Sequence, residues 1–180
     1  MTRHLPAIRK LDADELEQRL PDLAKLLRDC VQAGASVNFI LPFEQADAER
    51  FWRNKVTGPV RNGVRLVLIA EAAGRIAGTV QLDWDTPPNQ THRADVTKLL
   101  VHPDFRRRGI ARQLMAALET EAAALHRSLL TLDTRTGDDA EPLYLSMGYQ
   151  VAGQIPGFSR DPFTDVLDAT TLMYKQMPAA

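Results

Sequence analysis

Apolar residues recur every three or four positions in two segments near the start of the chain, with polar residues between them. This spacing is typical of helices that bury one face. We therefore expect a helix over 16–28, interrupted by Pro21, and a second helix over 43–56. Gly58-Pro59 is expected to end the second helix, because proline cannot continue a helical hydrogen-bond ladder.

The middle of the chain changes to short β-branched and alternating apolar runs, which are typical of strands. The runs 64–71 and 75–83, separated by a turn, predict an antiparallel hairpin. An amphipathic helix is expected to begin at Gly109 or Ile110. The remaining expected elements are strands over 94–101, 128–134, 149–155 and 169–175, and a short helix over 139–147. This order predicts a mixed α/β (α+β) fold, a central sheet flanked by helices, in a single domain over 1–180.

Composition and charge narrow the range of functions. The 180 residues are 44% hydrophobic and 25% charged, as in ordinary globular proteins. The net charge of −1 provides no field to attract nucleic acid or anionic lipid, so neither nucleic acid nor a membrane is expected as a partner. The single cysteine, Cys30, excludes an internal disulfide and is expected to pack in an apolar helix. With no signal-peptide pattern at the start, these features suit a cytoplasmic location. The histidine spacing is not that of a metal site, so no metal is expected.

The most informative segment lies between the strand 94–101 and the helix that follows it. A helix N-terminus presents unpaired backbone N–H groups and the positive end of the helix dipole, so anions bind there. Gly109 and the small Ala111 permit the close approach of a bulky phosphate group. Four arginines add positive charge at this point: Arg106, Arg107, Arg108 and Arg112. The alternative interpretation is a solvated basic turn at the start of a helix.

These residues resemble the diphosphate-binding loop of the GNAT superfamily of N-acetyltransferases. Its pattern Arg/Gln-x-x-Gly-x-Gly/Ala is matched by Arg106, Gly109 and Ala111. A second pattern of the superfamily, Leu-Tyr-x-x-x-Gly-Phe/Tyr, is matched by 143–149, and the resemblance covers about the C-terminal two-thirds of the chain. One departure is Gly137, which stands where an asparagine often binds the pantetheine arm.

The resemblance implies a GNAT fold, with a mixed and mostly antiparallel sheet, and acetyl-CoA as the co-substrate. It implies direct acetyl transfer to an amine, with the strands ending at Val101 and Asp133 diverging to admit the pantetheine arm. A backbone N–H near Leu100 or Val101 would polarise the thioester carbonyl. The residues expected to bind the cofactor are Leu99, Leu100, Val101, Arg106, Arg107, Arg108, Gly109, Ile110, Ala111 and Arg112.

Three side chains are candidates for proton transfer. Asp95 and Asp133 match acidic positions of the tabtoxin-resistance acetyltransferases, which belong to the same superfamily. Asp95 replaces a longer glutamate there, so we expect a bridging water at this position. Tyr144 is the candidate general acid for the departing thiolate. Taken without the resemblance, the same residues would be a strand-edge charge, a turn acid and a half-buried core tyrosine.

The similarity to the tabtoxin-resistance enzymes implies a small-molecule amine as the acceptor, specifically an amino-acid-like toxin or antibiotic. Ser36 and Asn38 are candidates to contact its polar end, and a helix N-cap is an equal alternative. A homodimer formed through sheet edges is a further expectation. The competing functions are acetylation of a protein or polyamine amine, and a regulatory module that binds acyl-CoA without catalysis.

Overall fold

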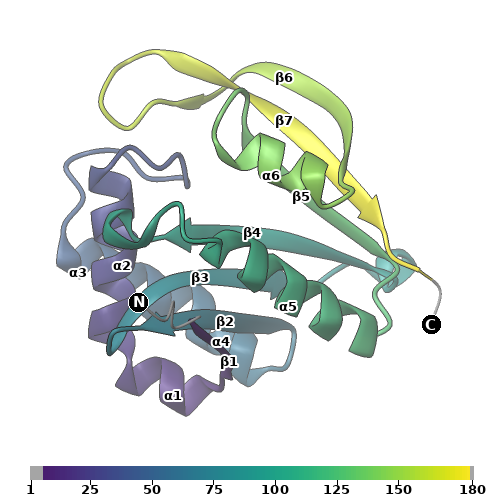
Figure 1. Ribbon diagram of the computed structural model, residues 1–180, viewed down its shortest axis with the longest axis horizontal. Helices are drawn as coiled ribbons and strands as arrows, with labels where there is room; N and C mark the ends of the chain where they lie inside the picture. Colours follow the sequence, from purple (N-terminus) through teal and green to yellow (C-terminus); the bar gives the residue numbers. More distant parts are fainter. Residues whose placement is uncertain (1–5, 179–180) are drawn as a thin grey trace.

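Seven strands form one sheet in the order β1-β2-β3-β4-β5-β7-β6. The computed structural model describes residues 6–178 (Figure 1). Neighbouring strands are antiparallel except β4 and β5, which are parallel. The strands are β1 (Ala7–Leu11), β2 (Arg65–Ala72), β3 (Arg75–Asp83), β4 (Arg93–Val101), β5 (Leu129–Arg135), β6 (Gln150–Arg160) and β7 (Leu167–Gln176).

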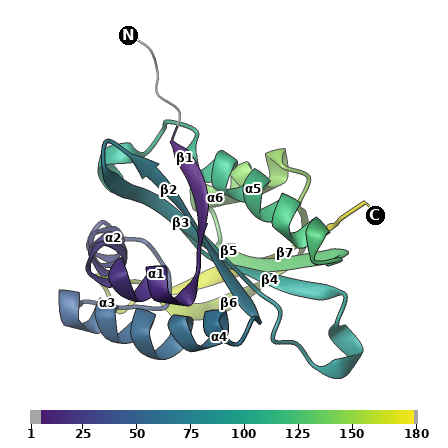
Figure 2. The same cartoon turned by 90° about the horizontal axis from the view of Figure 1, so that it is seen from below.

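Helices cover both faces of the sheet, with α1 to α4 on one side and α5 and α6 on the other (Figure 2). Side chains alternate along β2, so Leu66 and Leu68 pack in the cluster with α5, while Val67 and Ile69 pack in the cluster with α2. The expected mixed α/β fold with a mostly antiparallel sheet is therefore confirmed. The helices are α1 (Ala13–Gln18), α2 (Leu20–Gln32), α3 (Gln45–Phe51), α4 (Gly58–Arg61), α5 (Ile110–Ala124) and α6 (Ala140–Ser146).

The parallel contact between β4 and β5 is short. It runs from Arg93, which faces Leu129, to Asp95, which faces Thr131. Beyond this point the two strands diverge, as Figure 1 shows. The divergence expected from the family resemblance is thus present in the sheet itself.

A β-bulge lies on the other edge of β4. Val80 of β3 faces two residues of β4, Lys98 and Leu99, where one would be expected. Lys98 takes a φ of +53°, in the left-handed region. A bulge bends its strand and increases the local twist. The last residues of β4 are therefore aimed differently from the residues that contact β5.

Two helix predictions near the N-terminus need correction. Pro21 does not interrupt a helix over 16–28, because it lies in the first turn of α2, where the missing N–H costs nothing. Leu16 belongs to the separate helix α1. That helix begins after Asp12, whose side chain accepts the N–H of Glu15 in a capping box.

The prediction that Gly58-Pro59 ends the second helix is also wrong. The helix continues from α3 through a π-helical turn (Trp52–Thr57) into α4. In an α-helix the carbonyl of Lys55 would accept from residue 59, and proline has no N–H to give. That carbonyl instead accepts from a guanidinium N–H of Arg65 at 2.9 Å. The lost hydrogen bond is replaced from outside the helix.

Strand β1 was missed in the sequence, and β6 and β7 extend beyond their predicted ends. Of the five residues of β1 only Leu11 is buried, and Arg9 and Lys10 break the apolar pattern. The predicted end of β6 at residue 155 falls short because the strand continues to Arg160. Most of β6 is exposed, so alternation gave little signal there.

Candidate active site

The loop between β4 and α5 presents a row of free backbone donors. Gly109 precedes the helix with a φ of +80°, and Gln113 N–H donates to Gly109 O at 3.2 Å. Within residues 6–178, the N–H groups from residue 107 to residue 112 have no acceptor. Such a row at the positive end of a helix dipole is an anion-binding arrangement.

These donors open onto a cavity of about 600 Å³ at the divergence of β4 and β5, a size that suits an organic ligand. One wall is the loop itself with the start of α5. The end of α2 contributes Cys30, the turn after it contributes Gly34, and the opposite wall is formed by residues near the start of α6. A second hollow, of about 490 Å³ beside Lys10 and Trp84, contains none of the candidate residues.

The cavity is lined by every residue predicted to bind the cofactor except Arg108. The residues that line it are Leu99, Leu100, Val101, Arg106, Arg107, Gly109, Ile110, Ala111 and Arg112. Arg108 instead donates to Asp104 O at 2.7 Å and lies over the Phe105 ring, 5.2 Å from its centroid. It stabilises the shape of the loop. Arg112 also donates to Ser146 Oγ at 2.6 Å and so links α5 to the end of α6.

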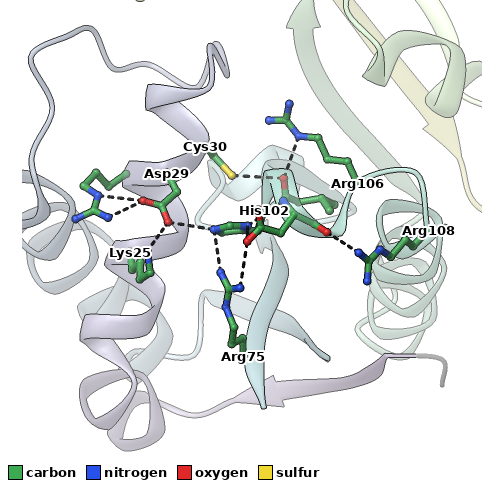
Figure 3. Close-up of polar contacts among 10 residues, drawn as sticks. Lys25, Asp29, Cys30, Arg75, His102, Arg106 and Arg108 are labelled. Carbon is green, nitrogen blue, oxygen red and sulfur yellow. Dashed lines mark hydrogen bonds and ion pairs between the residues drawn. The ribbon is translucent and has the colours of Figure 1, made fainter. Parts of the chain in front are cut away.

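A buried polar cluster attaches the loop to α2 (Figure 3). The His102 side chain, 8% exposed, places Nε2 3.0 Å from Asp29 Oδ2, and its Nδ1 accepts the N–H of Asp104 at 3.1 Å. Burial raises the pKa of Asp29, but hydrogen bonds from Lys25, Arg28 and His102 outweigh it and hold this pKa at about 2. A charged Asp29 therefore holds His102, and through it the start of the loop.

The backbone of Val101 is turned toward the cavity. Hydrogen-bonded and non-bonded pairs alternate along an antiparallel ladder, and His102 N–H donates to Ala77 O at 2.9 Å. The N–H and carbonyl of Val101 therefore point away from β3, and the carbonyl accepts from Arg106 Nε and Cys30 Sγ. Figure 3 shows both side chains meeting at this carbonyl. Burial raises the pKa of the Cys30 thiol to about 12, so this thiol is not a nucleophile at neutral pH.

Asp133 on β5 and Tyr144 on α6 lie close enough for the Asp133 charge to affect the Tyr144 phenol. Asp133 is exposed on β5, and its Oδ2 accepts from Thr170 Oγ1 at 3.2 Å. Tyr144 is buried on α6. Burial raises the Tyr144 pKa above its usual value, and the charges of Asp133 and Asp138 raise it further. The site thus pairs an exposed carboxylate with a phenol that keeps its proton at neutral pH.

Asp95 lies on the same face of the sheet as Asp133. Its Oδ1 accepts from Arg93 and from the hydroxyl of Thr131, the residue it faces on β5. Thr131 and Asp133 are two positions apart on β5, so their side chains share a face. Both bonds end on Oδ1, which leaves Asp95 Oδ2 available for a water or a substrate.

Ser36 and Asn38 lie between α2 and α3. The N-cap of α3 is Glu44, so the alternative of a helix cap is wrong for both residues. The cavity wall includes Gly34 and Ala35 but neither Ser36 nor Asn38, and Asn38 is exposed with a φ of +76°. A substrate role for these two residues stays a prediction.

Two cavity residues, Arg135 and Asp138, were not singled out in the sequence. Their charges lie 3.5 Å apart, and Arg135 donates to Gly34 O at 3.4 Å. They flank Gly137, whose φ of +78° turns the chain between β5 and α6. Glycine in place of the usual asparagine at 137 marks this turn as unusual in the sequence. It does not indicate that Arg135 and Asp138 line the cavity.

Within residues 6–178, no group of three or more His, Cys, Asp or Glu side chains is arranged to hold a metal ion. In the same part of the chain, no helix combines the length and the apolar character needed to cross a bilayer.

Several acetyltransferases are similar to this chain in sequence or in fold. Residues 63–151 match the acetyltransferase (GNAT) domain family. An uncharacterized N-acetyltransferase of Azospirillum brasilense, from the hisH-hisA intergenic region, is 33% identical over 125 residues, 68% of this chain and 72% of that protein. Acetyltransferase YE1169 of Yersinia enterocolitica is 32% identical over 120 residues, 64% of this chain and 82% of that protein. The structure of YncA from Salmonella typhimurium with its cofactor acetyl-CoA superposes with a TM-score of 0.75 at 18% identity, covering 97% of this chain and 95% of that one.

Proposed function

Since the chain belongs to the GNAT family of acetyltransferases and is an acetyl-CoA-dependent N-acetyltransferase, we propose that its acceptor is the primary amine of a small, amino-acid-like molecule such as a toxin or antibiotic. The observation that carries the proposed site is the row of free N–H groups from residue 107 to residue 112. It opens onto a cavity at the divergence of β4 and β5. Asp133 lies on β5 and Tyr144 on α6, the helix that follows it.

The cofactor is held by the loop and the start of α5. The free N–H groups bind its diphosphate, and Arg106, Arg107 and Arg112 on the cavity wall neutralise the remaining charge. The pantetheine arm lies between β4 and β5. The N–H of Val101, directed away from β3, donates to the thioester carbonyl and stabilises the charge that develops on it during attack.

The two polar groups at the divergence move the protons. Asp133 accepts a proton from the acceptor ammonium, directly or through water, so that the amine nitrogen has a free electron pair. The C–N bond forms as the C–S bond breaks, and the nitrogen then loses its second proton to solvent, which leaves a neutral amide. Tyr144 donates its proton to the departing sulfur and recovers it from solvent. Its raised pKa keeps the phenol protonated at neutral pH, so the proton is present when the C–S bond breaks.

Asp95 completes the site as the second carboxylate on the same face. Its free oxygen holds a water that carries the amine proton toward bulk solvent. Acetylation of a polyamine is the weaker alternative, because a net charge of −1 gives no strongly acidic groove.

The decisive experiment measures CoA release with a panel of small amines, including amino acids and β-lactam analogues. Asp133→Asn and Tyr144→Phe are each expected to lower kcat by about 10²- to 10⁴-fold, the usual contribution of general base or acid catalysis. The matched controls are Asp14→Asn, at an aspartate that is 83% exposed on α1, and Tyr174→Phe on β7. Tight cofactor binding without turnover of any amine would select the regulatory module instead.

A homodimer and a cytoplasmic location belong to the same proposal. Strand β6 is an edge of the sheet and exposes Val151, Ile155 and Phe158, a surface suited to pairing with a second chain. Light scattering that gives the mass of one chain at micromolar concentration would contradict the dimer. The buried free thiol of Cys30 and the use of acetyl-CoA favour the cytoplasm, which cell fractionation would test.

A further inference from the structure

Lys98 lies at the bulge of β4, and the reaction described above gives it no role. Its Nζ lies 5.8 Å from the ring centroid of Phe39 and 5.6 Å from that of Phe51. The two rings meet edge to face with their centroids 5.2 Å apart. The ammonium is thus held by two aromatic rings, an arrangement that favours a cation.

Lys98 is half-buried, and within residues 6–178 its Nζ forms neither a hydrogen bond nor an ion pair with another protein group. Its Nζ is not one of the fully buried polar atoms that lack a partner, so a ligand can reach it. Burial lowers the pKa of Lys98, the Asp133 carboxylate partly offsets this, and the Arg65 charge lowers it again. An ammonium carries three N–H donors, and aromatic rings are weak acceptors. An anionic ligand can therefore supply the acceptor that the protein itself does not give this half-buried cation.

Lys98 also lies on the side of the sheet where the candidate carboxylates face. Ala94 and Val96 pack toward α5, so Asp95 between them faces the opposite side, toward α2 and α3. The Lys98 side chain reaches Phe51 of α3 on that same side. Leu132 also packs toward α5, so Asp133 faces the same side as Lys98. The ammonium on β4 and the exposed carboxylate on β5 are close enough for the Asp133 charge to affect the Lys98 pKa.

A free amino acid carries the complementary pair of groups, an amine and a carboxylate separated by one carbon. We infer that Lys98 anchors the carboxylate of the acceptor, and that the acceptor is an α-amino acid or a compound with the same amine–carboxylate pair. The anchor directs the amine toward Asp133. This inference rests on the proposed N-acetyltransferase function and names the chemical feature that selects its substrate.

The test compares each amino acid with the amine that remains when its carboxyl group is removed. Suitable pairs are phenylalanine with phenethylamine, tryptophan with tryptamine, and leucine with isoamylamine. The wild type is expected to favour the amino acid of a pair by about 10- to 100-fold in kcat/KM, the usual value of one charge-assisted hydrogen bond. Lys98→Met keeps the apolar stem and removes the charge. It should raise KM for the amino acid by a similar factor and leave kcat/KM for the amine partner within about threefold.

Two further variants keep the outcome clear. Lys98→Arg retains the charge and should keep most of the preference, which separates an anchor from a packing residue. Lys55→Met removes an exposed lysine in the π-helical turn and should change neither member of a pair. The anchor is overturned if Lys98→Met lowers kcat/KM equally for both members of a pair, or if the wild type prefers the amines without a carboxyl group. In either case the acetyltransferase proposal stands. Absence of turnover with every member of the panel overturns both.

Discussion

Replacing Gly109 by glutamate tests whether the start of α5 holds a diphosphate. The new carboxylate would stand among the free N–H groups that we assign to the phosphates. Two unit charges about 6 Å apart interact by about 3 kcal/mol at an effective dielectric constant of 20. Even one such repulsion corresponds to a loss of about 100-fold in affinity for the cofactor.

The substitution also strains the backbone, and a matched control removes that contribution. Gly109 has a φ of +80° and Gly74 a φ of +73°. An added Cβ at Gly74 meets no atom within 4 Å, and at Gly109 it meets only Gln113 Nε2, at 3.9 Å. Both glutamate variants therefore pay a similar left-handed backbone cost of about 1–2 kcal/mol in folding stability. Only the variant at Gly109 places its charge at the cavity.

Calorimetry with CoA and thermal unfolding separate the two effects. Both variants should unfold at similarly lowered temperatures, whereas only Gly109→Glu should lose CoA affinity by about 100-fold. Added salt should weaken CoA binding to the wild type, because the contact is between charges. If Gly109→Glu bound CoA within about threefold of Gly74→Glu, the assignment of the diphosphate to this helix start would be refuted.

Three other outcomes follow from the structure. A Cβ at Gly78 would lie 2.7 Å from Leu100 O. Gly78→Ala should therefore lower the temperature of unfolding by a few degrees and raise KM for acetyl-CoA. The control is Gly153→Ala, whose Cβ meets nothing within 4 Å and which should change neither quantity. The folded pKa of Asp29 lies at about 2, below the ordinary aspartate value of 3.8, so its stabilising contribution is present above pH 3.8 and lost as the pH falls through 2. Urea unfolding should show the difference in stability between wild type and Asp29→Asn shrinking over that range. With its pKa raised to about 12, Cys30 should resist iodoacetamide at about pH 8 until denaturant is added, and rapid labelling of the folded protein would contradict its burial against the cavity.

The sequence predicted those parts of the site that depend on local chemistry. The donors around Gly109 belong to any helix start, and the strand, basic loop and helix follow one another without a break. Contacts between distant segments could not be foreseen in this way. The pairing of Lys98 with Phe39, and of Arg135 with Gly34, depends on how the loop after α2 packs over the sheet.

Errors in the predicted elements have the same physical origin. Pro59 has no N–H and would by itself be expected to break a helix. Arg65, at the start of β2, donates to Lys55 O in place of the missing N–H. Strand β1 has almost no local pattern and forms because β2 offers it a free edge. In each case a tertiary contact outweighed a local preference.

The parallel contact between β4 and β5 ends at Asp95 and Thr131, which leaves a slot between the backbones of the two strands. The loop after α2 is joined to the segment between β6 and β7 by Leu41 N–H, which donates to Pro162 O at 3.1 Å. Along the sides of the slot, peptide groups of both strands lack a strand neighbour, so an extended ligand that carries its own amides can take the place of an absent strand. The two halves of the sheet would then be joined through the ligand. Ligand binding should therefore slow the hydrogen exchange of backbone amides in both β4 and β5.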